Sequence, residues 1–159
     1  MTESQNIFDN PIFFEGYKKL RSNENSANNI EEKPALFSLS PDLAGKAVLD
    51  LGCGYGENCA EFKTLGASRV LGIDISEKML AVAAEEHPDI EFIRADMSDL
   101  SFIKEKYDVA FSSLAVHYVK DFAAFVNGVH GLLNPGGYFI FSIINPAAQR
   151  SFMISENLR

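Results

Sequence analysis

Short apolar runs alternate with amphipathic stretches along the chain from about Lys46 onward. Each run is bounded by turn-forming residues and is rich in Val, Ile, Leu and Phe, which is typical of a buried β-strand. Helical segments separate most of these runs. The pattern therefore predicts an α/β protein whose mainly parallel sheet is covered by helices on both faces. The predicted strands are Ala47–Leu51, Val70–Ile75, Glu91–Arg94, Tyr107–Ser112 and Tyr138–Ile144.

Helix signals mark the segments between the strands. Ser76 is a typical N-cap, with Glu77 in the first turn, and the helix that it begins must end near Pro88. Before the last strand, apolar residues recur with helical periodicity as far as the breaker at Asn134–Gly137. We therefore expect helices over residues 57–65, from 76 to near 88, and from 121 to 133.

Residues 1–33 differ from the rest of the chain in composition, because asparagine is frequent and glycine is scarce. Asn10 offers an N-cap, with Pro11 at the first helical position. Apolar residues then share one helical face, so we expect a short amphipathic helix there and a second short helix over Pro34–Leu39. We divide the chain into an N-terminal helical or lid segment, residues 1–33, and a ligand-binding domain, residues 34–159.

A glycine-rich loop, with Gly52, Gly54 and Gly56, joins the first predicted strand to its helix. This order places backbone N–H groups at a helix N-terminus beside the carboxyl end of a strand, where open α/β sheets bind ligands. Asp50 adds a carboxylate immediately before the loop. A pyrophosphate would be repelled by this charge, whereas a ligand with an ammonium or sulfonium group would be attracted.

Acidic residues also follow the second and third predicted strands. Asp50, Asp74 and Asp96 are separated by about one strand-and-helix unit each, so we expect their carboxylates to line one crevice at the carboxyl edge of the sheet. Asp74 is placed to accept hydrogen bonds from both hydroxyls of a ribose, and Met79 is placed to pack on a flat heterocycle. Asp96 could accept from an exocyclic amine, with the backbone N–H of Met97 reaching a ring nitrogen.

The order of these motifs resembles that of the class I S-adenosylmethionine-dependent methyltransferases, over about Lys46 to Ile144. Tyr107–Phe111 and Leu132–Gly137 are also typical of that family. The resemblance implies a doubly wound, Rossmann-like sheet of order 3-2-1-4-5, S-adenosylmethionine as cofactor and S-adenosylhomocysteine as product. It implies that the acid before the glycine loop orients the methionine ammonium. The implied cofactor-binding residues are Tyr17, Arg21, Asp50, Gly52, Cys53, Gly54, Asp74, Ile75, Met79, Asp96, Met97 and Ser113.

Several of these residues also have a structural interpretation. Tyr17 and Arg21, which in bacterial relatives would fold over the cofactor carboxylate, could equally be an amphipathic face and a surface charge. Asp96 lies in good turn sequence, Met79 has the spacing of a core methionine, and Cys53 is expected to pack rather than to react.

Ser113 and His117 follow the fourth predicted strand, where the transferable methyl group should point. His117 could take a proton from an acceptor hydroxyl or amine. A positioned nucleophile needs no base, however, so a structural or cofactor-lining His117 is the alternative. The run Ser112–Ala115 lacks the Asn/Asp-Pro-Pro-aromatic sequence of enzymes that methylate base amines. We therefore expect a small-molecule acceptor.

Charge and composition limit the kinds of ligand and partner that we expect for this chain. Lys and Arg number 14 against 22 Asp and Glu, so the net charge is −8 and predicts neither a nucleic-acid nor an anionic-membrane surface. Cys53 and Cys59 fit no zinc spacing, and no cluster resembles a divalent-metal site, so we expect no metal. Without a signal-peptide pattern or an apolar run of membrane-spanning length, we expect a cytoplasmic protein.

Members of the family usually continue beyond the fifth strand with a helix and two more strands, for which residues 145–159 are too few. We therefore expect an incomplete domain whose Tyr138–Ile144 strand is an apolar edge, covered in a longer protein or by a second copy in a homo-oligomer. Two alternatives to a methyltransferase stay open. One is a non-catalytic or truncated S-adenosylmethionine-binding module. The other is an NAD-dependent oxidoreductase, although the usual dinucleotide-binding glycine motif has glycine at the position that Glu57 occupies here.

Overall fold

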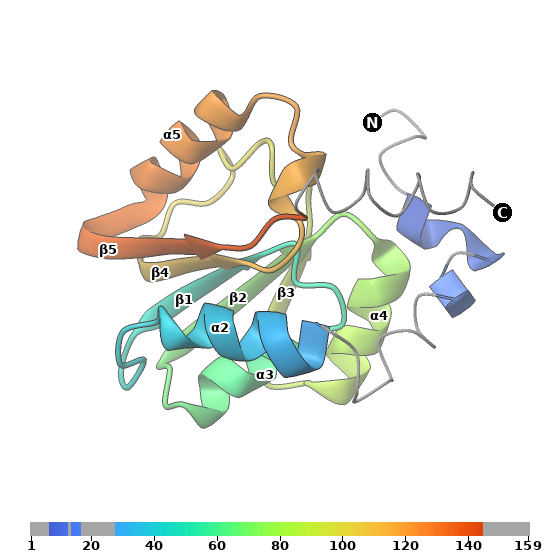
Figure 1. The fold of residues 1–159 in the computed structure, drawn as a ribbon, viewed down its shortest axis with the longest axis horizontal. Helices are drawn as coiled ribbons and strands as arrows, with labels where there is room; N and C mark the ends of the chain where they lie inside the picture. The colour runs from blue at the N-terminus through green and yellow to red at the C-terminus, as the bar shows by residue number, and fades with distance from the viewer. Residues whose placement is uncertain (1–6, 13, 17–27, 145–159) are drawn as a thin grey trace, which may run out of the picture.

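The computed structural model describes residues 7–12, 14–16 and 28–144. Its central feature is a five-stranded parallel sheet with the order β3-β2-β1-β4-β5. Helices lie on both faces of this sheet (Figure 1). The predicted fold class and strand order are therefore confirmed. The strands are β1 (Ala47–Leu51), β2 (Arg69–Asp74), β3 (Glu91–Arg94), β4 (Tyr107–Ser112) and β5 (Leu133–Phe141).

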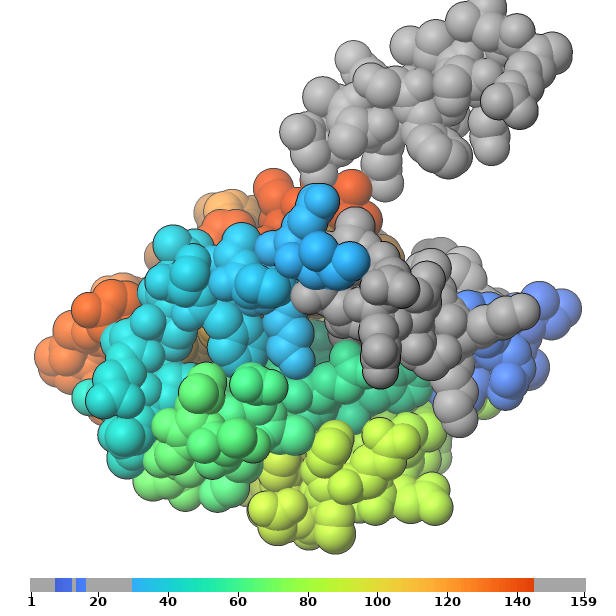
Figure 2. All heavy atoms as spheres, turned by 60° about the horizontal axis from the view of Figure 1, so that its bottom comes forward, coloured from blue at the N-terminus to red at the C-terminus, as the bar shows by residue number. Residues whose placement is uncertain are grey.

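One face of the sheet is covered by α2 (Lys33–Ser38), α3 (Glu57–Thr64) and α4 (Glu77–Glu86). In Figure 2, which brings this face forward, the blue of α2, the green of α3 and the yellow-green of α4 lie one after another across the surface. Phe62 of α3 and Phe111 of β4 meet there at 4.9 Å between ring centroids. This core fixes α3 directly behind the glycine loop from which the helix begins.

The opposite face is covered by α5 (Phe122–Leu132), whose Phe125 and Val129 are buried against the sheet. Successive residues of a strand face opposite sides of a sheet, and β1 follows this rule. Val48 lies in the core under α3, whereas Leu49 and Leu51 lie in the core under α5.

The N-terminus of α4 forms as the sequence predicts, and α5 begins with a similar cap that was not predicted. Ser76 caps α4 by accepting a hydrogen bond from the Met79 N–H at 3.2 Å, and Asp121 caps α5 by accepting from the Ala124 N–H at 2.9 Å. The last strand differs from the prediction. It begins at Leu133, which pairs with Tyr107, and ends at Phe141 instead of Ile144. Regular pairing resumes only at Tyr138, because residues 134–137 are accommodated as an irregularity opposite the short step from Tyr107 to Val109.

The described part of the N-terminal segment lies against the carboxyl edge of the sheet. It comprises η2 (Ile7–Asp9), helical residues at 11–12 and 14–16, and η3 (Asn28–Glu32). Asp9 joins η2 to the start of α4, because its carboxylate accepts hydrogen bonds from the Ser76 hydroxyl at 2.6 Å and the Lys78 N–H at 3.2 Å. Tyr17 and Arg21, both predicted to bind the cofactor, lie outside the described residues.

Candidate functional site

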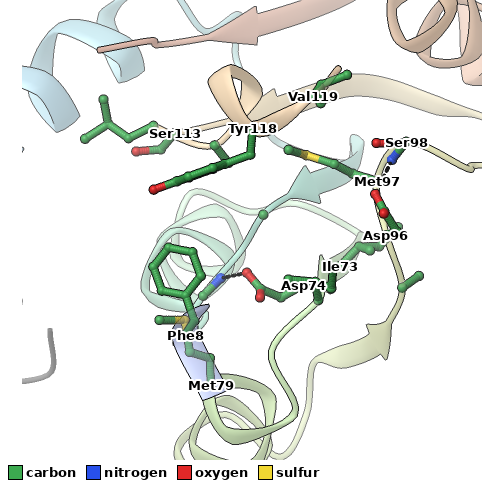
Figure 3. A pocket seen from close by; sticks show the side chains of 16 residues that line it. Phe8, Ile73, Asp74, Met79, Asp96, Met97, Ser98, Ser113, Tyr118 and Val119 are labelled. Carbon is green, nitrogen blue, oxygen red and sulfur yellow. Dashed lines mark hydrogen bonds between the residues drawn. The ribbon is translucent and has the colours of Figure 1, made fainter. Parts of the chain in front are cut away.

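A cavity of about 150 Å³ opens at the carboxyl ends of β1, β2 and β4 (Figure 3). Its walls come from the glycine loop, the start of α4, the loop after β3, the turn after β4 and η2. This is the edge at which the sequence predicts a ligand. The lining residues are Phe8, Gly52, Gly54, Ile73, Asp74, Ile75, Met79, Ala95, Asp96, Met97, Ser98, Ser113, Leu114, Ala115, Tyr118 and Val119.

The glycine loop can form this wall only with glycine at its turning points. Gly52 has φ 79° and Gly54 has φ 55°, in the left-handed region that other residues rarely adopt. A Cβ atom on Gly52 would lie 2.4 Å from the Cβ of Ala115, so the turn after β4 rests directly on the loop. The bare backbone at these positions is what a ligand needs for close approach.

Asp74, the last residue of β2, is the best-defined polar group of the cavity. Its carboxylate accepts a hydrogen bond from the Gly54 N–H at 2.8 Å, the dashed line at Asp74 in Figure 3, and another from the Ser76 N–H at 2.9 Å. A carboxylate has about four acceptor positions, so these bonds leave Asp74 capacity for further donors. Burial raises the pKa of Asp74 above its ordinary value of 3.8, and the backbone hydrogen bonds oppose that rise.

The predicted heterocycle contacts also come together. Met79 is buried in α4, and its sulfur would lie 3.7 Å from a Cβ on Gly54. Asp96 and Met97 line the opposite wall (Figure 3). The Asp96 carboxylate accepts the Ser98 N–H at 2.8 Å. Asp96 therefore caps a turn, as its structural interpretation expects, and it also lines the cavity, as its functional interpretation expects.

Asp50 does not line the cavity, so the prediction that it shares one crevice with Asp74 and Asp96 is wrong in this respect. Its side chain is only 1% exposed and accepts a hydrogen bond from the Cys59 thiol of α3 at 3.4 Å. The strand register explains the difference, because Asp50 pairs with Gly72, two residues before Asp74. Its orientation of a cofactor ammonium stays a prediction.

Cys53 was also expected at the cofactor, but its side chain is buried in the core under α3 and does not line the cavity. A Cβ on Gly72 would lie 2.9 Å from its sulfur. Burial raises the pKa of the Cys53 thiol to about 11, and contact with Cys53 together with burial raises the pKa of Cys59 well above 9.0. Both thiols are therefore protonated at neutral pH and pack rather than react.

The turn after β4 carries the predicted acceptor side of the site. Ser113 lines the cavity, whereas His117, in η4 (Val116–Tyr118), does not. The His117 ring packs on Tyr118 at 4.2 Å between centroids, and partial burial lowers its pKa below 6.5. A neutral imidazole outside the cavity wall agrees with the structural interpretation of this residue; proton transfer by His117 stays a prediction.

Sequence reasoning did not identify Phe8 and Tyr118, which meet edge to face at 5.8 Å across the cavity. The Ser113–His117 motif runs directly into Tyr118, so its position after β4 was a usable signal. Phe8 gave no such signal, because it belongs to a segment with no strand–helix pattern. Only the fold brings its ring to the cavity.

These features define a class of protein. Residues 49–141, more than half of the chain, match the methyltransferase domain family. The sheet order and the ligand edge are those of the Rossmann-like fold of this class. The chain therefore belongs to the class I S-adenosylmethionine-dependent methyltransferases.

Individual relatives support this assignment. A crystal structure of an S-adenosylmethionine-dependent methyltransferase from Mesorhizobium loti is 44% identical, with a TM-score of 0.70 over 77% of this chain and 56% of that one. An uncharacterized protein of Haemophilus influenzae is 37% identical over 154 residues, 92% of this chain and 61% of that protein. The phthiotriol/phenolphthiotriol dimycocerosates methyltransferase of Mycobacterium tuberculosis is 32% identical over 108 residues, 66% of this chain and 40% of that protein. The chain thus spans about half the length of the curated relatives it matches.

Within the described ranges, no helix combines the length and the apolar character needed to cross a bilayer. No group of His, Cys, Asp and Glu side chains in the same ranges is arranged to hold a metal ion.

Proposed function

We propose that this chain binds S-adenosylmethionine in the cavity at the carboxyl edge and transfers its methyl group to a small-molecule acceptor. The observation that carries the proposal is the meeting of the bare Gly52–Gly54 backbone with Asp74 and Asp96 at one cavity. S-Adenosylmethionine supplies an electrophilic methyl group on a sulfonium. The protein's own contribution is to bind this cation, to hold the acceptor in line with it and to exclude water.

The residues present fit this cofactor. Asp74 has acceptor capacity for both ribose hydroxyls, and Asp96 for an exocyclic amine. Met79 and Met97 offer polarizable apolar surface to a purine. Phe8 supports the proposal that residues 1–33 form a lid, because it lines the cavity from η2. The lining contains acids and no Lys or Arg among the described residues, which favours a cationic ligand.

A small-molecule acceptor is supported by the acidic charge of the chain and by the absence of the base-methylating motif after β4. We also propose that the protein is cytoplasmic and acts without nucleic acid or membrane. Tyr138 and Phe141 are exposed on β5, the edge strand of the described sheet, which supports a homo-oligomer paired through this edge.

Titration calorimetry with S-adenosylmethionine and NAD side by side tests the cofactor. We expect binding of the former alone, and the opposite result would favour an oxidoreductase. Transfer of a tritiated methyl group from S-adenosylmethionine to a panel of hydroxyl, amine and thiol acceptors then tests turnover. Cofactor binding without transfer to any acceptor would favour the non-catalytic or truncated module.

A further inference from the structure

The turn after β4 contains an unusual backbone conformation. Leu114 lines the cavity and has φ 50°, the only positive φ of a non-glycine residue in the described part of the chain. This region is unfavourable for a residue with a Cβ atom, and it persists only where neighbouring groups hold it. The question is therefore which groups hold Leu114.

A hydrogen-bond chain leads from Leu114 to the N-terminal segment. The Leu114 N–H donates to the Ser142 hydroxyl at 2.9 Å, and the Ser142 hydroxyl donates to the Glu32 carboxylate. The Ser113 hydroxyl donates to the same carboxylate oxygen at 2.9 Å. Glu32 thus joins η3 to the ends of β4 and β5, and it is bonded to the turn directly through Ser113 and indirectly, by way of Ser142, through the Leu114 N–H.

The direction of these bonds follows from their chemistry. An ionised carboxylate only accepts, and a serine hydroxyl has a single proton to donate. Because Ser142 gives its proton to Glu32, its oxygen is left to accept the Leu114 N–H. Glu32 also precedes α2 as its N-cap, yet its side chain makes no capping bond to that helix. The carboxylate serves the turn instead.

The Ser113–Ala115 turn packs directly against the glycine loop. Ala115, next to Leu114, lies so close to Gly52 that even a methyl group there would overlap with it. A shift of Leu114 toward an ordinary φ would therefore displace the wall on which the loop rests. Resting on the proposed function, we infer that Glu32 is a positioning residue that holds the Ser113–Ala115 turn in its cofactor-binding conformation.

Calorimetric titration with S-adenosylhomocysteine tests this inference on the full chain. Apparent affinity falls in proportion to the fraction of molecules in the competent conformation, so a turn held only about one-tenth of the time binds about tenfold more weakly. We expect at least this loss for Glu32→Ala. Glu32→Gln keeps a carbonyl oxygen for both hydroxyls and should stay within about twofold of wild type. The matched control is Glu31→Ala, an exposed acid in the same helix, which should also stay within about twofold.

A second readout needs no cofactor. Exchange of the Leu114 amide proton, followed by NMR, should be faster in Glu32→Ala than in Glu32→Gln or wild type. If Glu32→Ala does not fold, Ser142→Ala removes the acceptor of the Leu114 N–H but leaves the Ser113–Glu32 hydrogen bond to the N-terminal segment, and it should weaken binding similarly. Where both fold, the double variant should show little further loss, because both changes break one chain.

The outcomes separate the two proposals. Wild-type affinity and unchanged Leu114 exchange in Glu32→Ala would overturn the role of Glu32 and leave the proposed function standing. A Glu32→Gln variant as weak as Glu32→Ala would overturn the positioning argument, because charge rather than hydrogen-bond geometry would then decide. A wild-type chain that does not bind S-adenosylhomocysteine would refute the proposed function and, with it, this inference.

Discussion

Asp74 offers the sharpest test of the cofactor site. Asp74→Ala removes the acceptor proposed for both ribose hydroxyls. Hydrogen bonds to a charged group contribute about 1.5–3 kcal/mol each, so the loss of two costs about 3–6 kcal/mol of binding free energy. At about 1.4 kcal/mol for each factor of ten, S-adenosylhomocysteine should bind about 10²- to 10⁴-fold more weakly in a calorimetric titration.

The same substitution affects folding, because the Gly54 and Ser76 N–H groups lose their shared acceptor. Asp121→Ala is a matched control. Asp121 is also an acid that accepts a backbone N–H at a helix start, but it caps α5 and does not line the cavity. It should lower the free energy of unfolding by about 1 kcal/mol and leave ligand affinity unchanged. If Asp74→Ala folds and binds within about threefold of wild type, the ribose assignment is refuted.

Further predictions follow from the same cavity. Burial raises the pKa of Asp74, and only its ionised carboxylate accepts hydrogen bonds from two hydroxyls. The affinity for S-adenosylhomocysteine, measured by calorimetric titration between about pH 4 and 8, should therefore fall on acidification with a midpoint above pH 3.8. Constant affinity down to pH 4 would contradict this prediction. Gly52→Ala should abolish detectable binding, since it adds a methyl group 2.4 Å from Ala115 at a φ of 79°, whereas Gly131→Ala, with open space around it, should bind normally. His117→Ala should bind within about twofold of wild type, since His117 packs on Tyr118 outside the cavity wall; a larger loss in a folded variant would show a direct contact.

The strand–helix part of the fold could be predicted because its signals are local. β1, β3 and β4 have the predicted boundaries, since each is a short apolar run between turn residues. The start of β5 could not be predicted in the same way. Leu133 continues the apolar stripe of α5 and only its pairing with Tyr107, a contact between distant residues, makes it part of the strand.

The candidate site shows the same division. Asp74 and Asp96 were predicted at the cavity because the carboxyl ends of parallel strands share one edge. Asp50 follows the same spacing rule but lies two residues deeper, roughly 7 Å along the strand, as the register with β2 shows. Spacing along the chain identifies the edge at which an acid lies, whereas register determines whether its side chain reaches the surface of that edge.

The N-terminal segment lies beyond the reach of this reasoning for a different reason. Phe8, Asp9 and Glu32 contact the sheet edge through single side chains, and no periodicity links them to strands that are separated from them by tens of residues. Each contact nevertheless involves the cavity or a residue that builds it. The strand–helix pattern thus predicts the glycine loop and the acid at the end of β2, whereas the contact of Glu32 with the turn after β4 comes from a segment outside that pattern. If Glu32 holds the turn as inferred, relatives that share the glycine loop and the acid at the position of Asp74 should differ in ligand affinity with the residue at the position of Glu32, which calorimetric titration of such relatives would measure.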